Sequence, residues 1–560
     1  MQKGLLAGAE LSMIMGQRVG MYSAHVDTFA RDNLPPAHLW PDLRSTLPEL
    51  QYPERINCGA ILLDDAVREG YASHTAIIGA AGRWTYAALL DQANRIANVL
   101  VQEMGIVPGN RVLLRGPNCP MLAACWIAVM KVGAIAVTTM PLLRARELGQ
   151  IAAKARVDHA LCDVRLMQEL SATTLATGLL AKVLTWGGQL EALMERHPGT
   201  FANVDTASDD ICLLAFTSGT TGNPKATMHF HRDVLAMADV VGRHLLDTGP
   251  SDVYVGSPPL GFTFGLGALL VFPLRFRATV ALVEQPTPEN LLEAVQQFGA
   301  TCLFTSPTMF RALTALVVGY DLRTLQRAVS AGEPLPRVTS DAWYAATGIR
   351  LIDGLGATEM IHIFISAKGE DIRPGSTGKP LPGYEAAVLD EEGHPLPPGQ
   401  PGRLAVRGPT GCRYLDDARQ AEYVRNGWNL TGDQYLIDAD GYFWFQARAD
   451  DMIISAGYNI AAPEVEAALL EHPSVKEVAV IGAPNAERGQ IVKAFIVLQP
   501  GYASGPALCQ ELQDFVKQTI APYKDPRAIE FLAQLPKTSS GKLQRHVLRQ
   551  DPPRTCSPMG

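Results

Sequence analysis

Short apolar runs alternate with helical patterns up to about residue 445, and this alternation limits the chain to few folds. Buried strands that alternate with helices favour an α/β architecture in which the strands are largely parallel. The runs that predict strands are Arg111–Leu114, Ala134–Thr138, Ile211–Phe216, Thr279–Val283, Thr301–Phe304 and Arg350–Ile352. In such a fold, phosphate-binding residues are expected on loops beyond the carboxyl ends of the strands.

The pattern changes after Arg448 and predicts a second, smaller α+β domain of about 110 residues. Its expected elements are a helix over Pro463–Leu470, strands over Val475–Ile481 and Lys493–Leu498, a helix over Gly505–Thr519 and a strand over Ala528–Leu532. The Pro/Gly-rich stretch 393–408 predicts turns that join short antiparallel strands, such as Arg403–Arg407. We therefore expect a large N-terminal domain over 23–449 that includes a small β-subdomain, a C-terminal domain over 450–560, and a disordered leader over 1–22.

Composition excludes several classes of protein. A formal net charge of −8 argues against nucleic acid as a partner. The longest apolar stretch, Met121–Met140, is broken by Lys131 and Gly133, so it predicts a buried helix and a strand rather than a membrane span. The leader lacks the pattern of a secretory signal, and the nine cysteines show no CxxC pairs. We expect a cytoplasmic protein with reduced cysteines.

The segment Thr217-Ser218-Gly219-Thr220-Thr221-Gly222-Asn223-Pro224-Lys225 directly follows the apolar run Ile211–Phe216. Its glycines let the backbone turn and approach a ligand, while its hydroxyls, amides and lysine match the needs of a triphosphate. An amphipathic helix is expected downstream, so the segment is interpreted as a strand, a phosphate-holding loop and a helix. The spacing of the glycines does not fit the Walker pattern, so a different class of nucleotide enzyme is indicated.

A second cluster, Asp353-Gly354-Leu355-Gly356-Ala357-Thr358-Glu359, follows the predicted strand that ends at Ile352. A dinucleotide fingerprint would have a third glycine at the position of Glu359. A carboxylate beside pyrophosphate makes sense when a cation lies between them, so Glu359 is predicted to hold Mg²⁺ against the phosphates.

A third pattern, His229-Phe230-His231, has the alternate spacing of a metal pair, but no third ligand lies close in the sequence. A zinc site is therefore not expected there. Asp233 is expected to be the N-cap of the following helix.

These motifs resemble the adenylate-forming superfamily, which includes acyl- and aryl-CoA ligases, luciferases and the adenylation domains of peptide synthetases. Thr217–Lys225 matches its signature loop, and Thr358–Glu359 matches its Gly-x-Thr-Glu motif, in which the threonine orients phosphate and acyl groups. Leu535–Arg545 matches its C-terminal signature, with Lys542 as the catalytic lysine. An ammonium at that position would stabilise the negative charge that builds on the α-phosphate. By itself this last segment is a basic loop.

The resemblance also implies the remaining nucleotide contacts. Gly332, Glu333 and Pro334 would line the adenine pocket, and Asp353, Gly354 and Leu355 would also bind ATP or AMP. Taken alone, segment 330–336 also fits a plain turn before a helix. Asp433 and Arg448 would approach the ribose; without the resemblance they are a turn aspartate and a surface charge. Asp450 matches the hinge between the two domains, and Gly457 and Tyr458 would line the coenzyme A tunnel.

Within the superfamily, the strings Gly354–Ser366 and Ser23–Pro36 look like the benzoate and 2-aminobenzoate (anthranilate) CoA ligases. A planar ring would fit between Phe262, Thr263 and Phe264 on one side and Leu355, Gly356 and His362 on the other. His362 could accept a hydrogen bond from an ortho amine, and it could equally be a packing residue. Segment 452–460 is more similar to the 2-aminobenzoate enzymes.

The expected reaction converts an aromatic acid and ATP to aryl-AMP and pyrophosphate, and then transfers the acyl group to coenzyme A. ATP, Mg²⁺ and CoA are the expected cofactors. The expected acid is 2-aminobenzoate, followed by benzoate or another substituted benzoate. The sequence also leaves open a carrier protein as the acyl acceptor, a nucleotide sensor without activity, and a homodimer.

Overall fold

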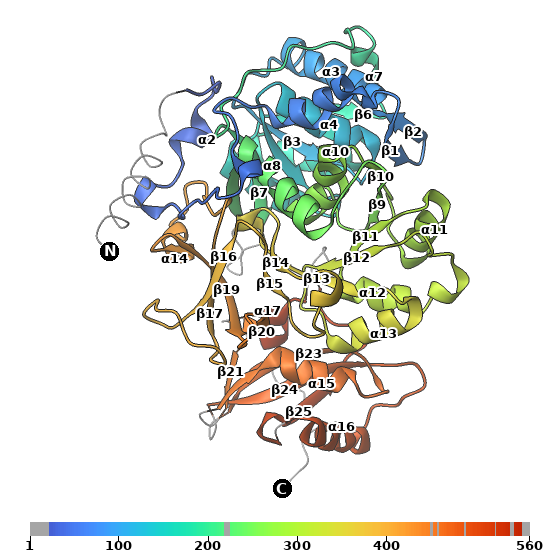
Figure 1. Ribbon diagram of the computed structural model, residues 1–560, viewed down its shortest axis with the longest axis vertical. Helices are drawn as coiled ribbons and strands as arrows, with labels where there is room; N and C mark the ends of the chain where they lie inside the picture. The colour runs from blue at the N-terminus through green and yellow to red at the C-terminus, as the bar shows by residue number, and fades with distance from the viewer. Residues whose placement is uncertain are drawn as a thin grey trace.

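Two mostly parallel sheets form the large upper part of the molecule (Figure 1). The computed structural model describes residues 22–217, 224–448, 452–455, 458–485, 489–520, 522–537 and 543–550. One sheet has the order β6-β5-β3-β4-β7-β8, with β3 Arg111–Arg115, β4 Ile135–Thr139, β5 His159–Asp163, β6 Lys182–Trp186, β7 Ile211–Thr217 and β8 Lys225–Phe230. All its neighbours run parallel except β7 and β8.

The second sheet has the order β15-β14-β13-β12-β11-β9-β10-β1-β2. Its strands are β1 Thr75–Gly79, β2 Gly82–Thr85, β9 Val253–Gly256, β10 Thr279–Ala281, β11 Cys302–Thr305, β12 Arg327–Ala331, β13 Leu351–Gly356, β14 Ile363–Ser366 and β15 Lys379–Pro380. Strands β1 and β9 to β13 run parallel, and antiparallel pairs close both edges. The largely parallel α/β architecture predicted from the alternation is confirmed.

Helices lie between and around these sheets (Figure 1). They are α3 Tyr86–Gln102, α4 Pro120–Lys131, α5 Ala145–Ala155, α6 Met167–Thr177, α7 Gln189–Met194, α8 His231–Met237, α9 Thr263–Leu266, α10 Phe272–Arg275, α11 Pro288–Phe298, α12 Pro307–Thr314 and α13 Arg337–Thr347, with π-helical turns η3 Ala60–Asp64, η6 Ala238–Leu245 and η7 Gly267–Val271. Helix α4 contacts β3 and β4 of one sheet and β1 of the other. It is buried on all sides from Leu122 to Lys131, as expected for a helix between two sheets.

A smaller antiparallel sheet and a C-terminal α+β unit complete the chain (Figure 1). The antiparallel sheet contains β16 Glu385–Leu389, β17 Gly402–Arg407, β18 Val424–Arg425, β19 Trp428–Ile437 and β20 Phe443–Arg448, with α14 Gln420–Tyr423 beside it. The C-terminal unit contains β21 Met452–Ser455, β22 Tyr458–Ala461, α15 Ala462–Leu470, β23 Val475–Asn485, β24 Gly489–Leu498, α16 Pro506–Thr519, β25 Ala528–Phe531 and α17 Arg545–Gln550. The predicted boundary at 449–450 lies outside the described residues and stays a prediction, as does the leader.

The long apolar stretch 121–140 forms most of α4 and all of β4, as predicted. Among the described residues, no helix combines the length and apolar character needed to cross a bilayer.

Two local predictions were wrong. The glycine-rich segment does not lead from a strand into a helix, because Lys225 begins β8, which folds back antiparallel on β7 before α8 starts. Asp233 is not an N-cap residue. It is the third residue of α8, where its carboxylate accepts a hydrogen bond from the Phe230 amide at 3.0 Å from within the first turn.

Candidate active site

The predicted nucleotide residues lie at neighbouring strand ends. Gly332, Glu333 and Pro334 directly follow β12, and Asp353 and Gly354 lie on β13, which pairs in parallel with β12. Gly332 has a φ of 92°, a conformation that favours glycine. The hydroxyl of Thr308 donates to Glu333 Oε2 at 3.0 Å and links the turn to α12. Parallel pairing thus brings segments 332–334 and 353–354, both predicted to bind the nucleotide, together near the carboxyl ends of β12 and β13.

The connection between β13 and β14, residues 357–362, holds both Glu359 and His362. Thr358 and Glu359 lie in a short 3₁₀ turn, η9 Thr358–Met360. Glu359 is 9% exposed, and its Oε1 accepts a hydrogen bond from the hydroxyl of Tyr414 at 2.5 Å. Burial and the Glu359 charge raise the pKa of Tyr414, so its hydroxyl stays protonated and donates. Tyr414 therefore fixes the carboxylate without neutralising it.

Lys225 approaches the same tyrosine from the hairpin. Its Nζ lies 3.4 Å from the hydroxyl oxygen of Tyr414 and 5.1 Å from the ring centroid. Lys225 pairs with Thr217 across β7 and β8, so the two ends of the predicted phosphate loop lie side by side, with the Lys225 end at Tyr414. Ser218, Gly219, Thr220, Thr221 and Gly222 lie outside the described residues. The flanks of the loop and the Glu359 segment are thus brought together by Tyr414.

A series of buried polar side chains supports the backbone at Thr358. His229 Nε2 donates to the carbonyl oxygen of Thr358 at 2.8 Å, and its Nδ1 lies 3.7 Å from Asp233 Oδ2. Asp233 forms a salt bridge with Arg413, and both side chains are fully buried. Burial would raise the pKa of Asp233, but Arg413, His229 and Arg232 together outweigh it and hold the pKa below its usual range. Fixed charges thus anchor the backbone of this turn.

At the other end of the connection, His362 packs among aromatic rings. Its ring centroid lies 5.7 Å from that of Phe264 and 4.6 Å from that of Phe272. A Cβ at Gly267 would lie 2.4 Å from His362 Cδ2, so the glycine makes room for the imidazole. Phe264 also lies 5.8 Å from Phe304. Phe264 and His362, which were predicted for opposite walls of the aryl pocket, thus lie in direct contact, and the pocket itself stays a prediction.

The protonation state of His362 follows from these contacts. Its Nε2 donates to the carbonyl oxygen of Phe264 at 3.2 Å. Burial lowers its pKa to about 4, so the ring is neutral near pH 7. With the proton on Nε2, Nδ1 is a hydrogen-bond acceptor, and this buried atom has no protein partner among the described residues.

Ile361, between the two ends, has a φ of 66° and a ψ of −36°. A β-branched residue in this region is strained, and such strain persists only where its surroundings hold it. Thr410 donates to the carbonyl oxygen of Met360 at 2.9 Å, and Ile361 is fully buried. A Cβ at Gly356 would lie 2.9 Å from the backbone of His362, so glycine is required where β13 passes this turn.

The predicted ribose residues lie on neighbouring strands of the small antiparallel sheet. Asp433 pairs with Arg448 across β19 and β20. Tyr435 lies nearby: burial, then the charges of Asp433 and Asp353, raise its pKa. Asp353 and Asp433 are thus close to the same tyrosine. Burial raises the pKa of Asp353 itself to about 7.

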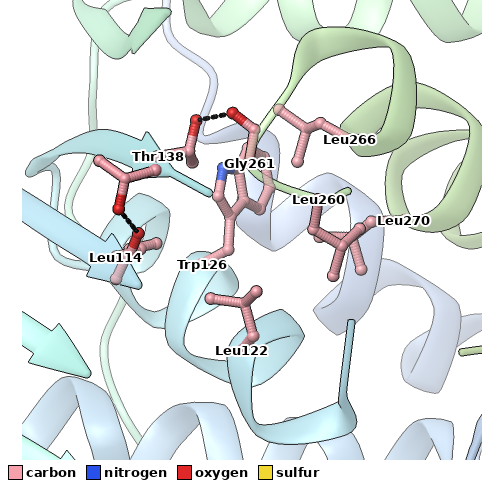
Figure 2. A pocket seen from close by; sticks show the side chains of 9 residues that line it. Leu114, Leu122, Trp126, Thr138, Leu260, Gly261, Leu266 and Leu270 are labelled. Carbon is pink, nitrogen blue, oxygen red and sulfur yellow. Dashed lines mark hydrogen bonds between the residues drawn. The ribbon is translucent and has the colours of Figure 1, made fainter. Parts of the chain in front are cut away.

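A small apolar cavity lies behind the segment that carries Phe262, Thr263 and Phe264 (Figure 2). Figure 2 shows the Thr138 hydroxyl bonded to the carbonyl oxygen of Gly261, with Trp126 below. The residues that line this cavity are Leu114, Leu122, Trp126, Thr138, Thr139, Leu260, Gly261, Leu266 and Leu270. These described lining residues are all uncharged, so this cavity belongs to the core that supports the segment.

The C-terminal predictions fall largely outside the described residues. Asp450, Gly457 and Lys542 are not described, and Tyr458 is the first residue of β22. The ends of segment 538–542 are held in place: Lys537 bridges to Leu543, and its Nζ lies 2.6 Å from Glu477 Oε2. Arg545 Nη2 lies 2.6 Å from Glu466 Oε1 on α15. Helix α15 contacts α13 and β20, so this unit borders the large domain.

Tyr414 and His229 are the contacts that sequence reasoning missed. Tyr414 is 55 residues from Glu359, and His229 is 129 residues from Thr358. Tyr414 lies in no motif with a chemical spacing, and the spacing of His229 and His231 indicates a metal pair rather than a contact with Thr358, so the sequence carries no local signal for either contact.

Comparisons with known proteins agree with this arrangement. Residues 63–413 match the model of the AMP-binding enzyme family, and residues 464–542 match that of the AMP-binding enzyme C-terminal domain. The benzoate–CoA ligase of Thauera aromatica is 34% identical over 522 residues, which cover 91% of this chain and 98% of that protein.

Two solved structures are similar throughout. The anthranilate CoA ligase AuaEII in complex with anthranoyl-AMP is 34% identical, with a TM-score of 0.86 over 90% of this chain and 98% of that one. A benzoate CoA ligase from Burkholderia xenovorans LB400 is 30% identical, with a TM-score of 0.80 over 88% of this chain and 100% of that one. These matches confirm the resemblance to the adenylate-forming superfamily and its benzoate–CoA ligase branch. The chain belongs to the AMP-binding enzyme family.

Proposed function

We propose that the protein is an ATP-dependent aryl-CoA ligase whose preferred acid is 2-aminobenzoate. It would join the acid to ATP, release pyrophosphate, and transfer the acyl group from the aryl-AMP to CoA. The similar proteins named as benzoate and anthranilate CoA ligases support the reaction class. Benzoate is the second candidate, because two of those three proteins are named for it.

The observation that favours 2-aminobenzoate is the Nδ1 atom of His362, which has no partner among the described residues. An ortho amine has two N–H groups: one can bond its own carboxylate, and the other remains free to donate. A neutral imidazole with its proton fixed on Nε2 offers the matching acceptor. An ortho hydroxyl has a single proton, which it donates in a hydrogen bond to the carboxylate of the same molecule. The aromatic surroundings of His362 suit the ring of the acid.

The phosphates would lie on the other side of the same connection. Glu359 offers the carboxylate oxygen that Mg²⁺ prefers, and Tyr414 leaves its second oxygen free of that bond. Thr358, Lys225, Thr217 and the loop residues Ser218 to Gly222 would hold the triphosphate. Gly332, Glu333, Pro334, Asp353, Gly354 and Leu355 would surround the adenine, with Asp433 and Arg448 at the ribose. Mg²⁺ bound there would offset the charge of the phosphates.

The second half of the proposal concerns the small domain. Lys542 would stabilise the charge that develops on the α-phosphate, and removal of such a contact costs on the order of 100-fold or more. Asp450 would be the hinge, and Gly457 and Tyr458 would line the path of CoA. Lys542→Ala should therefore block adenylate formation and spare transfer from preformed aryl-AMP, whereas Lys537→Ala is the control within the same basic segment.

The test is ATP-dependent pyrophosphate release and thioester formation with 2-aminobenzoate, benzoate, salicylate and a medium-chain fatty acid, each with and without CoA. The proposal requires the highest kcat/KM for 2-aminobenzoate and formation of its CoA thioester. A preference for benzoate would keep the reaction and reject the role of His362. Pyrophosphate release without thioester would point to a carrier protein, and no release with any acid would leave a nucleotide sensor.

A further inference from the structure

A cluster of three ligand-type side chains lies apart from the residues assigned above. The sulfur atoms of Cys58 and Cys212 and a ring nitrogen of His231 all lie within 4.8 Å of one another, and all three residues are fully buried. His231 Nδ1 lies 3.1 Å from Cys58 Sγ and 3.2 Å from the Cys58 amide nitrogen, which donates to it. Nδ1 therefore carries its lone pair, which accepts from the Cys58 amide beside Cys58 Sγ.

Each ligand comes from a different element. Cys58 precedes η3, Cys212 lies on β7, and His231 is the first residue of α8. The ladder between β7 and β8 shifts register between Ile211 and Leu213, so Cys212 occupies an irregularity in the strand. Bulges of this kind redirect a side chain that regular pairing would point elsewhere. The sequence gap of 173 residues between Cys58 and His231 explains why the spacing around His229 and His231 indicated no metal site.

Two sulfurs and one imidazole form a soft ligand set. Thiolates select Zn²⁺ and Cu⁺ over the hard cations Mg²⁺ and Ca²⁺, which bind oxygen. Metal–sulfur distances of about 2.3 Å and metal–nitrogen distances of about 2.0 Å require ligand atoms roughly 3.5 to 4 Å apart. The cluster meets this condition with small adjustments. Its complete burial makes charge balance important, because an unpaired charge there would be costly.

We propose that Cys58, Cys212 and His231 bind one thiophilic d¹⁰ cation, Zn²⁺ or Cu⁺, at a structural site. Zn²⁺ would replace both S–H protons by metal–sulfur bonds and release two protons to solvent, which leaves a neutral site. Cu⁺, which suits three-fold coordination, would replace one S–H proton and release one, with the second sulfur bound as a thiol. In both cases neutral His231 donates to the cation through Nδ1 in place of accepting from the Cys58 amide. Both cations share this ligand chemistry, and the experiment distinguishes them.

The site would join three segments behind the hairpin of β7 and β8. Cys212 is five residues before Thr217 on β7, and His231 directly follows β8. A bound cation would therefore hold both strands of the hairpin against the segment at Cys58. Because the cation binds only the folded chain with high affinity, its binding should raise thermal stability. This inference does not depend on the proposed reaction.

The experiment uses full-length protein, reduced and stripped with a chelator, then titrated anaerobically with Zn²⁺ or Cu⁺ and dialysed before metal analysis. Co²⁺ serves as a spectroscopic probe, since thiolate ligands give a sulfur-to-cobalt charge-transfer band. Cys212→Ala is the test variant. Cys302→Ala is the matched control, because Cys302 is also fully buried in a strand of a parallel sheet.

We expect one tightly held cation per chain in the wild type and in Cys302→Ala. Binding in Cys212→Ala should be weaker by roughly 100-fold or more, since even residues that only support metal ligands change affinity by roughly 10- to 100-fold. A metal-dependent rise in Tm should be absent from Cys212→Ala. Stronger retention of Zn²⁺ or of Cu⁺ identifies the ion. The proposal would be overturned if the wild type showed neither stoichiometric metal nor the charge-transfer band, a result that does not depend on whether Cys212→Ala folds. Equal metal binding by Cys212→Ala and the wild type would also overturn it.

Discussion

The two ends of the β13–β14 connection, three residues apart, offer opposite environments. Glu359 is held by the Tyr414 hydroxyl near Lys225, whereas His362 packs against Phe264 and Phe272. The strained backbone at Ile361 separates them. One short segment therefore presents a charge suited to Mg²⁺ on one side and a neutral acceptor suited to an aromatic amine on the other. The difference shows that the surroundings, more than the segment itself, set the chemistry of each end.

Glu359→Gln should have the largest effect on this difference between the two ends, because it removes the negative charge at the Glu359 end. Loss of the Mg²⁺ ligand should lower adenylate formation by about 100-fold or more, measured as pyrophosphate release. Transfer from preformed aryl-AMP to CoA, where pyrophosphate has left, is the control and should change little. An equal loss of rate in both steps would show that Glu359 stabilises the structure of the site rather than binding Mg²⁺.

Tyr414→Phe tests whether the polar end depends on its neighbour. A hydrogen bond to a charged group contributes about 1.5–3 kcal/mol, so adenylate formation should fall by roughly 10-fold or more, with a higher Mg²⁺ requirement. Tyr423→Phe is the matched control, because that ring packs 5.7 Å from Tyr414. In a double-mutant cycle, Tyr414→Phe should add little to Glu359→Gln; full additivity would mean that the contact has no role.

His362→Leu examines the apolar end, since it keeps an apolar side chain and removes the acceptor. A lost neutral hydrogen bond of about 1 kcal/mol predicts a roughly 5-fold lower kcat/KM for 2-aminobenzoate. Benzoate, which lacks the amine, should be nearly unaffected and is the internal control. If both acids lose the same factor, His362 is a packing residue.

Asp353→Asn tests how much the ionised carboxyl group of Asp353, which lies next to segment 332–334, lowers the stability of the fold. The folded pKa of Asp353 is raised to about 7, above an ordinary aspartate, so the folded state binds more protons than the unfolded one between about pH 4 and 7. The wild type therefore loses stability as pH rises through this window. Asp353→Asn should have a higher Tm above pH 7, by about 2 °C for about 1 kcal/mol, and the gain should shrink toward pH 4. A pH-independent difference in Tm would contradict this assignment.

The regular elements were predictable because their signal is local. The apolar runs of β3, β7 and β11 define strands without tertiary information. In the structure each of these strands ends one residue later than predicted, and β11 also begins one residue later. The hairpin of β7 and β8 was missed although Lys225–Phe230 alternates polar and apolar residues, as a half-buried strand does. The segment is short, and its antiparallel pairing with β7 fixes it as a strand. The start of α8 was expected too late in the chain for the same reason, because the end of β8 sets the first turn of this helix.

The site was predictable where a motif has a chemical spacing, and much less so where contacts cross the chain. Thr358 and Glu359 stand out in the sequence, but Tyr414 and Arg413, which hold them, lie on a segment without such a pattern. Likewise, Cys58 and Cys212 are ordinary apolar positions until the fold brings them to His231. Long-range packing carries this information, and a single sequence does not display it.

Gly267 makes room for the His362 ring because it has no side chain. A Cβ there would lie 2.4 Å from His362 Cδ2 and force the ring to shift. Under the role proposed for His362, a single methyl group at position 267 would change acid preference without touching a residue that bonds the acid. Libraries designed to change that preference could begin at this position.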